Sequence, residues 1–294
     1  MNIAETQKVN FEILTAVLDI AERFNIDLWP LGGTEIGAVR EKDFIPWDDD
    51  VDLQMRLCDY EKLKAALNQE LPSHLRVIEP YDMEPYFYDF TIRIADTRFL
   101  LREEDDEERA LRNLNNHPSV EIFPISKAPD SRFAQRFLYY RCLMLYGQAM
   151  GHRYREYHDK TLVQKLGLSL LSFIGKRKSV KKIYTQYWNL TASYEEKNTH
   201  TVAHINEVIT ALNVSARDIS WKTAFLPASW FSSSSASEGM IRSRKVKLPI
   251  GYHEQLTHMY GDYMTPTSHP EGFIFHLSDE ERDEMHRIWQ ASQH

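Results

Sequence analysis

The stretch LGGTEIGAVREKDFIPWDDDVDL, residues 31–53, joins two adjacent glycines to four aspartates in five positions. Acidic side chains this close repel one another, so solvent, nearby cations or a bound metal must offset the repulsion. A strand at residues 51–55 would alternate its side chains between the two faces of a sheet. Asp50 and Asp52 would then share one face, and the apolar residues between and after them would pack on the other.

Two carboxylates side by side are ligands that hard cations prefer. Mg²⁺ typically takes one or two of them together with substrate phosphates. We therefore predict a Mg²⁺ or Mn²⁺ site at Asp50 and Asp52. Glu121 is the predicted third ligand, because a lone acid in the apolar run SVEIFPI would be costly to bury without a partner. Asp48 and Asp49 precede the strand, where they could support the ligands or simply face solvent.

The paired glycines predict a phosphate-binding turn. Gly32 and Gly33 lead into an expected short helix, TEIGAVR, and glycine lets backbone N–H groups approach a ligand closely. Thr34 could cap that helix or bind a phosphate. Arg40 and Arg93 are predicted to neutralise phosphate charge, and Arg40 could instead pair with the aspartates. A phosphate cradle next to a metal clamp fits phosphoryl transfer, in which catalysis is mostly positioning and charge neutralisation.

The composition excludes several classes of protein. The net charge of −8 over 294 residues argues against a general nucleic-acid binder, which would carry an excess of Lys and Arg. Two cysteines cannot form a disulfide framework, which fits a reducing cytoplasm. The N-terminus lacks the basic start and apolar core of a signal peptide, and no apolar run is long enough to span a membrane. We predict a cytoplasmic protein.

The order of the expected elements predicts an α+β fold with a helical cap. A helix is expected at 10–24 with Asn10 as its candidate cap, and a last helix from Pro249 to Gly261. The expected strands are 26–31, 51–55, 75–79, 86–95, 98–103 and 119–125, with a hairpin joining 86–95 to 98–103. The expected units are a catalytic core at 1–130, a helical region at 131–220 and a C-terminal segment at 221–294 that packs back on the core.

One predicted helix has an apolar stripe beside a basic run. Leu162, Leu166, Leu170 and Ile174 recur at helical spacing, and the basic run KRKSVKK follows them. An apolar helix face next to basic residues can lie on an anionic membrane surface. The alternative is a stripe that packs against the core, with the basic end in water. We favour the core-facing alternative and keep 161–182 as a candidate for peripheral contact with the inner face of a membrane.

Residues 31–53 closely resemble the signature of the LicD family. These nucleotidyltransferase-like phosphotransferases include the phosphocholine transferases of bacterial surface glycans and the fukutin-related ribitol-phosphate transferases. The resemblance continues in the family's order through TIRIADTR, VEIFPI, FLPASWF and LPIGYHEQLTHMYGDYM, and so covers most of the chain. It implies a nucleotidyltransferase-type mixed sheet with flanking helices. Carried over by position, Asp50 and Asp52 match the metal-binding pair, Gly32 and Gly33 the phosphate loop, and Arg40 the family's arginine.

The chain departs from the family pattern at two positions in one strand. Glu121 stands where the family usually shows Asp, and Ser126 stands where another Asp often follows. Glutamate keeps the charge but is longer by one methylene group. The departure therefore concerns the geometry of the metal site more than the presence of a ligand.

The resemblance also implies a reaction. LicD-family enzymes move a phospho-alcohol from a CDP-activated donor, such as CDP-choline or CDP-ribitol, onto a sugar hydroxyl, and CMP leaves. The implied partners are a CDP-alcohol and a glycan acceptor, such as lipopolysaccharide or teichoic acid, that could be lipid-linked; nucleic acid is not among them. Two alternatives stay open: a nucleotidyltransferase that releases pyrophosphate, and a non-catalytic nucleotide- or glycan-binding module. The presence of both metal aspartates disfavours the module.

A choline cargo would need aromatic faces for its ammonium group. Two groups of aromatic residues could supply them, and we favour ordinary core or sheet roles for both. The candidates are Tyr81, Tyr86, Phe87, Tyr88, Trp221 and Trp230.

Overall fold

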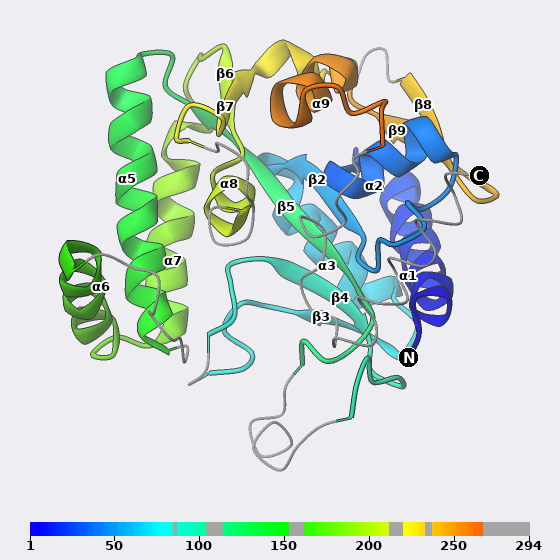
Figure 1. Ribbon diagram of the computed structural model, residues 1–294, viewed down its shortest axis with the longest axis horizontal. Helices are drawn as coiled ribbons and strands as arrows, with labels where there is room; N and C mark the ends of the chain where they lie inside the picture. Colours follow the sequence, from blue (N-terminus) through cyan, green and yellow to red (C-terminus); the bar gives the residue numbers. More distant parts are fainter. Residues whose placement is uncertain (85–86, 104–113, 153–161, 212–219, 233–236, 267–294) are drawn as a thin grey trace.

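The computed structural model describes residues 1–84, 87–103, 114–152, 162–211, 220–232 and 237–266 (Figure 1). Within them, seven strands form one mixed sheet in the order β1-β2-β5-β4-β3, to which β6 is added beside β5, and β7 beside β6. β2 and β5 are parallel and the other pairs are antiparallel. These strands are β1 (Trp29–Pro30), β2 (Asp52–Arg56), β3 (Leu75–Ile78), β4 (Ile92–Asp96), β5 (Ser119–Ala128), β6 (Thr201–Ala203) and β7 (Phe225–Pro227).

A separate hairpin and a set of helices complete the described fold, so the predicted α+β class is confirmed. The hairpin consists of β8 (Ser237–Ile241) and β9 (Arg244–Leu248). The helices are α1 (Ile3–Arg23), α2 (Gly32–Ile36), α3 (Tyr60–Glu70), α5 (Arg132–Ala149), α6 (Leu162–Gly175), α7 (Val180–Thr191), α8 (Ile205–Ala211) and α9 (Tyr252–Tyr260). A π-helical turn, Gly37–Glu41, continues α2.

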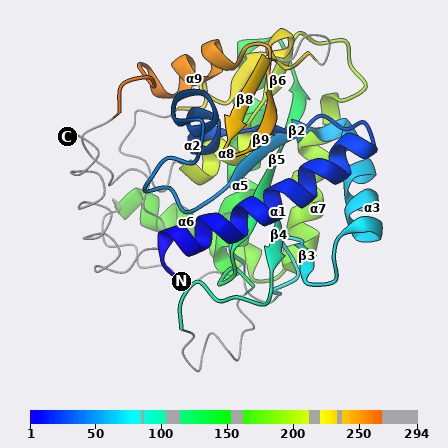
Figure 2. The same ribbon diagram turned by 90° about the vertical axis from the view of Figure 1, so that its right-hand side faces the viewer.

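One face of the sheet is covered by α1 and α3, and Figure 2 shows α1 running across it. The apolar residues that alternate along β2, β4 and β5 point to this face and form the main core with both helices. Leu53 and Ile122 are register partners in this layer, and both are fully buried. The intervening polar residues of the same strands must therefore point to the opposite face, which is where the candidate site lies.

The first helix begins earlier than the sequence predicts. Asn2 caps α1: its side chain accepts a hydrogen bond from the Glu5 N–H, and the Glu5 carboxylate accepts one from the Asn2 N–H, forming a capping box. Asn10, the predicted cap, lies in the middle of α1 and is buried. The prediction was wrong because Asn10 contacts a distant loop, which local spacing does not reveal.

The predicted strand at 98–103 and its hairpin are also wrong. β4 ends at Asp96, whose carboxylate accepts hydrogen bonds from the Arg98 backbone N–H at 3.1 Å and from the Arg98 guanidinium. The N–H of Phe99 then reaches the Asp96 carbonyl, so the chain turns away from the sheet. A side chain that binds the backbone two residues ahead competes with strand pairing in this way.

A second core joins α5, α7 and α8 to the far end of the sheet (Figure 1). β6 lies inside the region predicted to be helical and pairs with Ser126–Ala128 of β5. α6 packs on the outside of α5, with Leu171 against Gly147. The favoured core-facing placement of the α6 stripe is wrong, because Leu162, Leu166 and Leu170 are 80%, 72% and 61% exposed.

The C-terminal part of the described chain agrees with expectation. α9 follows Pro249 and ends at Gly261, which adopts the positive φ of 70° that favours glycine. The β8–β9 hairpin packs on α1, where Arg244 pairs with Asp19 and Glu22. Cys58 and Cys142 are both free. In the described residues, no helix is long and apolar enough to cross a membrane.

Candidate active site

Three neighbouring strands place two carboxylates and one guanidinium group in a row across the sheet. Asp52 of β2 is the register partner of Glu121 in β5, and Glu121 is in turn the partner of Arg93 in β4. Partners on adjacent strands point to the same face of a sheet. The structure therefore brings Asp52 and Glu121 together from positions 69 residues apart in the chain.

The residues before β2 add more buried negative charge to this row. Asp48 is 3% exposed, and its carboxyl shares a hydrogen bond with that of Asp50. Burial, followed by the charge of Asp50, raises the pKa of Asp48 well above its usual range. Burial also raises the pKa of Asp50, and burial together with Asp50 and Glu121 raises that of Asp52. The carboxyls thus repel one another at close range in a poorly solvated place.

The paired glycines lie directly beside the aspartates. The Leu31 N–H donates to the Asp52 carbonyl at 2.9 Å, and the Asp52 N–H donates to the Thr34 hydroxyl at 2.9 Å. A Cβ added at Gly33 would meet the carboxylate of Asp48, so a larger residue there would force the Asp48 side chain to move. Gly32 has a φ of +59°, which also favours glycine. Thr34 does not cap α2, which has no side-chain cap; it ties the glycine turn to β2.

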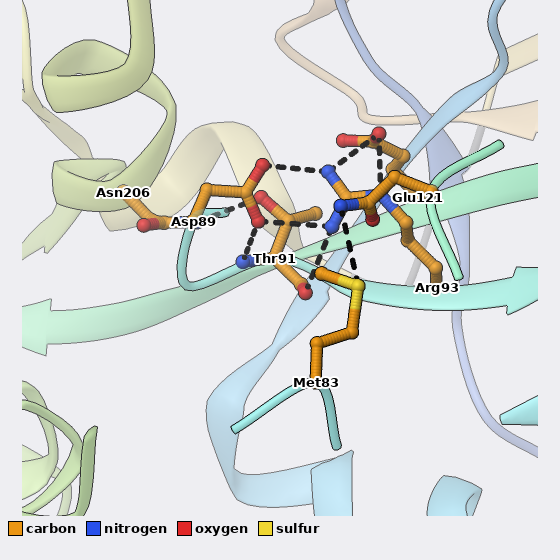
Figure 3. A network of polar contacts seen from close by, with 7 residues as sticks. Met83, Asp89, Thr91, Arg93, Glu121 and Asn206 are labelled. Carbon is orange, nitrogen blue, oxygen red and sulfur yellow. Dashed lines mark hydrogen bonds and ion pairs between the residues drawn. The ribbon is translucent and has the colours of Figure 1, made fainter. Parts of the chain in front are cut away.

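Arg93 is clamped between two acids (Figure 3). Its guanidinium donates to both carboxylate oxygens of Asp89, at 2.9 and 2.6 Å, and through Nε to Glu121 at 2.8 Å. Arg93 is 5% exposed and also stacks over the ring of Tyr88. Burial raises the pKa of Glu121 to about 7, although Arg93 acts in the opposite direction. Two further acids near the sheet are each bound by an arginine: Asp89 by Arg93, and Asp96 by Arg98.

The guanidinium group of Arg40 is bound by neighbouring residues. Its Nε lies 2.6 Å from a carboxylate oxygen of Glu41, and its Nη1 donates to the backbone carbonyl of Tyr263 at 2.7 Å. These contacts join the π-helical turn after α2 to the segment after α9. The predicted role of Arg40 in binding phosphate stays a prediction.

Two polar residues of α1 bind the backbone of residues 45–49, which we call the acidic turn. The sequence analysis did not predict these contacts. The Gln7 amide donates to the backbone carbonyls of Asp48 at 2.8 Å and of Ile45 at 3.1 Å. The Asn10 amide donates to the carbonyl of Asp49 at 2.9 Å. Asp49 itself is half-buried. These bonds fix the backbone that presents Asp48 and Asp50.

A further acid and a histidine lie buried near the row. Glu35 in α2 is fully buried, and neither of its carboxylate oxygens has a hydrogen-bond partner in the described part of the chain. Burial, then the charge of Glu207, raises the pKa of Glu35 well above its usual range, and Glu207 also acts on Asp52. The sequence offered a signal that was overlooked: Glu35 stands among apolar and small residues, as Glu121 does.

His204 lies at the start of α8, beside Glu207. Its Nδ1 is 3.7 Å from a Glu207 carboxylate oxygen, and its ring centroid is 5.6 Å from that of Phe231. Burial lowers the pKa of His204 to about 3, so the imidazole is neutral near pH 7 and the contact with Glu207 is not an ion pair there. Next to it, the Asn206 amide donates to the hydroxyl of Thr91 at 3.2 Å, which brings α8 against the strand that carries Arg93.

The aromatic candidates for a choline site pack as core residues or lie among other side chains. Phe87 is fully buried, Tyr81 stacks on Tyr184, and Trp221 and Trp230 contact Phe225 and His258. Tyr86 lies outside the described residues. A hollow between α7 and the sheet, lined by several aromatic rings, has a volume of about 20 Å³, which is room for one water.

We call Asp48, Asp50, Asp52 and Glu121, together with Arg93, the acidic row. Its carboxylates are ligands that suit a divalent cation. The described residues contain no three His, Cys, Asp or Glu side chains arranged to hold a metal ion. Mg²⁺, however, commonly takes only one or two protein carboxylates, with water and substrate phosphates completing its shell. Burial raises the pKa values of Asp50 and Asp52, and a cation at this pair would favour their charged forms. The pair therefore suits Mg²⁺ or Mn²⁺, and ligation by Glu121 stays a prediction.

Comparison with known proteins places these residues in a family. Residues 25–146 match the model described as LicD/FKTN/FKRP, nucleotidyltransferase domain. The chain is 25% identical over 301 aligned positions to the lipopolysaccharide cholinephosphotransferase LicD of Haemophilus influenzae, with 99% of this chain and 98% of that protein covered. Residues 25–146 are thus identified as a LicD-family domain, and the similarity to a LicD protein extends along almost the whole chain.

The LicD match contains the whole row described above. Its range starts before the paired glycines and runs past Glu121 into α5, so Asp50, Asp52 and Arg93 all lie within it. Helices α6 to α9 lie beyond the range of the LicD domain model, although the full-length relative covers them. The resemblance inferred from residues 31–53 is thereby confirmed at the level of the family.

Proposed function

We propose that this protein transfers a phospho-alcohol, phosphocholine or a close analogue, from a CDP-activated donor onto a sugar hydroxyl of a cell-surface glycan such as lipopolysaccharide. The LicD family and the near full-length similarity to a lipopolysaccharide cholinephosphotransferase support the type of reaction. The observation that carries the proposal is the row of Asp52, Glu121 and Arg93 beside Asp50 and the glycine turn.

The proposed reaction is a displacement at one phosphorus atom. The acceptor hydroxyl oxygen attacks the phosphorus that bears the alcohol, and the bond from that phosphorus to the bridging oxygen breaks. CMP leaves with the bridging oxygen and the electron pair of the broken bond. The hydroxyl proton passes to Glu121 or a carboxylate beside it. A Mg²⁺ or Mn²⁺ ion held by Asp50 and Asp52, when bound, supplies neutralisation of the diphosphate charge.

The chain's own residues position the reacting groups. Backbone N–H groups at Gly32 and Gly33 orient the donor phosphates, because no Cβ shields them. Arg93 binds Asp89 and Glu121 together, which favours a role in holding Glu121 over the phosphate-binding role that the sequence predicts. Gln7 and Asn10 hold the backbone of the acidic turn in place.

The test is a panel of donors with the full chain. CDP-choline, CDP-ribitol and CDP-glycerol are each incubated with the protein, Mg²⁺ and purified lipopolysaccharide, and nucleotide products are separated by chromatography. We expect CMP to form with one donor, the phospho-alcohol to appear on the glycan, and EDTA to stop both. Release of pyrophosphate from CTP in place of CMP would show the alternative, a nucleotidyltransferase. Donor binding without turnover on lipopolysaccharide or teichoic acid would point to a binding module and contradict the proposal.

A further inference from the structure

Two neighbouring helices expose apolar side chains along stripes of helical spacing. On α5, Phe133, Phe137, Tyr140 and Met144 follow one another at intervals of four, three and four residues. Their exposed fractions are 82%, 60%, 44% and 48%. The opposite side of the same helix, including Leu138 and Cys142, is buried in the second core. α5 thus has an apolar residue pattern on both its inner and its outer side.

The outer helix, α6, repeats the pattern. Leu162, Leu166, Leu170 and Phe173 are between 58% and 80% exposed and lie at helical spacing. α6 is close-packed on α5 and the turn after it: Ser172 lies against Gly151, where a Cβ would not fit. We call the two stripes together the α5–α6 apolar face; it consists of Phe133, Phe137, Tyr140, Met144, Leu162, Leu166, Leu170 and Phe173. Soluble domains rarely expose so many large apolar side chains on adjacent helices without a partner.

Arginine side chains cover the aromatic members of this face. The guanidinium carbon of Arg177 is 3.4 Å from the ring centroid of Phe173, that of Arg141 is 5.5 Å from Phe137, and that of Arg136 is 5.7 Å from Tyr140. The cations therefore sit at the apolar surface itself rather than on a separate side of the molecule. Such side chains can bury their stems in apolar material while their charged ends stay in a polar layer.

The sequence around these helices is strongly basic. Residues 131–191 contain 12 Lys and Arg and only two acids, Glu156 and Asp159. The rest of the chain holds 23 Lys and Arg together with 41 Asp and Glu. A protein of net charge −8 has thus gathered positive charge around its exposed apolar side chains. This pairing is the one expected for contact with a surface that is both apolar and anionic.

Other partners fit the face less well. A second copy of the chain would bring two basic surfaces together, and like charges across an interface are costly. A nucleic acid would match the charge but leave the leucines of α6 without an apolar partner. In the described residues no helix can cross a membrane, so α6 would lie along the bilayer surface rather than span it.

We propose that the α5–α6 apolar face docks the protein on an anionic lipid bilayer. The leucines and phenylalanines enter the boundary between head groups and acyl chains, and the flanking Lys and Arg bind lipid phosphates. This docking is independent of the transfer reaction and goes beyond it. Where the acceptor glycan is lipid-linked, it would hold the protein at the surface that carries the acceptor.

The test measures vesicle binding of the full chain by flotation, with no donor or acceptor present. Vesicles of phosphatidylcholine alone are compared with vesicles that also contain phosphatidylglycerol. We expect binding to the anionic vesicles, weakened by added salt. The double variant Leu166→Glu/Leu170→Glu should bind at least about tenfold more weakly, because both charges would have to enter the apolar layer. Lys176→Gln and Lys182→Gln should each weaken binding about fivefold.

Matched variants elsewhere separate docking from general stickiness. Leu100→Glu changes a leucine that is 43% exposed on the loop after β4, and Lys245→Gln removes an exposed lysine of β9. Both should bind vesicles as the parent protein does. Urea unfolding verifies that every variant is folded. Equal binding to neutral and anionic vesicles, or unchanged binding of the double leucine variant, would overturn the proposal. So would a dimer in light scattering that the double variant dissociates, without vesicle binding by the parent.

Because this assay contains no CDP-alcohol, its result does not depend on the proposed reaction. A protein that floats with vesicles but never releases CMP would keep the docking surface and lose the transferase. A protein that releases CMP but does not float with vesicles would keep the transferase and lose the docking surface.

Discussion

The acidic row and the α5–α6 apolar face depart from ordinary burial in opposite directions. The row buries charge: Asp48 and Arg93 are at most 5% exposed, and the nearby Glu35 is fully buried. The face exposes apolar surface, with Phe133 and Leu162 at 80% or more. Buried polar groups and exposed large apolar groups are both unusual in folded proteins. This difference underlies our two proposals: the row would meet a cation and phosphates, and the face would meet an apolar anionic surface.

The two departures also differ in what they cost the fold. Burying carboxyls lowers stability unless partners offset the loss of water, as Arg93 does for Asp89 and Glu121. Exposed leucines on α6 gain little from folding, so they neither stabilise nor strain the native state. Substitutions in the row should therefore change activity and, where they leave a buried charge without its partner, stability; substitutions in the face should change neither.

The largest expected effect is on catalysis. Asp52→Asn keeps the shape of the side chain but removes its charge, and we expect the rate at saturating donor to fall by about three orders of magnitude. The unfolding free energy should stay equal or rise, because a buried charge is removed. The rate is followed as CMP release and the stability by urea titration. Asp19→Asn, on the exposed side of α1, is the control and should keep the normal rate. A normal rate for Asp52→Asn would break the assignment.

The next largest expected effect is on stability, and it tests how much Arg93 stabilises the folded state. Arg93→Met keeps most of the length but leaves the buried carboxyl of Asp89 and the half-buried one of Glu121 without their cation, which we expect to cost about 3–5 kcal/mol in the free energy of unfolding. Arg23→Met removes the arginine of a surface pair with Glu70, in which the arginine is 56% exposed, and should cost about 0–1 kcal/mol. Chemical denaturation of both variants checks the prediction. Equal losses of unfolding free energy would show that the ion pairs of Arg93 contribute no more to stability than a surface pair does.

Two leucine-to-alanine substitutions compare how much the main core and the apolar face contribute to stability. Leu63→Ala in α3 empties a site that is 1% exposed, and we expect a loss of about 2–5 kcal/mol. Leu166→Ala on α6 should change the unfolding free energy by no more than about 0.5 kcal/mol, since that side chain is 72% exposed. Urea midpoints at equal slope give both values. A large loss at Leu166 would mean that the face is covered by another part of the chain.

The smallest expected effect depends on pH. The folded protein raises the pKa of Glu35, so its contribution is most favourable below the usual pKa of glutamate and is lost as the pH rises. Glu35→Gln cannot ionise. We expect it to match the parent near pH 4 and to be more stable by about 1–3 kcal/mol near pH 8. Urea titrations at the two pH values check this, and a gain that is the same at both would contradict the raised pKa of Glu35.

Much of the fold and part of the site could be predicted from the sequence. The alternation in VDLQM and the isolation of Glu121 correctly predicted β2, β5 and the gathering of acids near them. Arg93 was predicted as a site residue, but its contact with Asp89 was not, because that contact depends on how the chain enters β4. Gln7 and Asn10 gave no signal at all, since each contacts backbone carbonyls about 40 residues away.

The sequence by itself determined the local periodicities, the charge pattern and the family of this protein. Strand alternation put Asp52 and Gln54 on the face opposite Leu53, and helical spacing put the leucines of α6 in one stripe. Only the tertiary structure decided that Glu121 stands between Asp52 and Arg93, and that the α6 stripe faces outward. The physical reason is that backbone geometry fixes which residues share a face, whereas contacts between distant segments fix what that face meets.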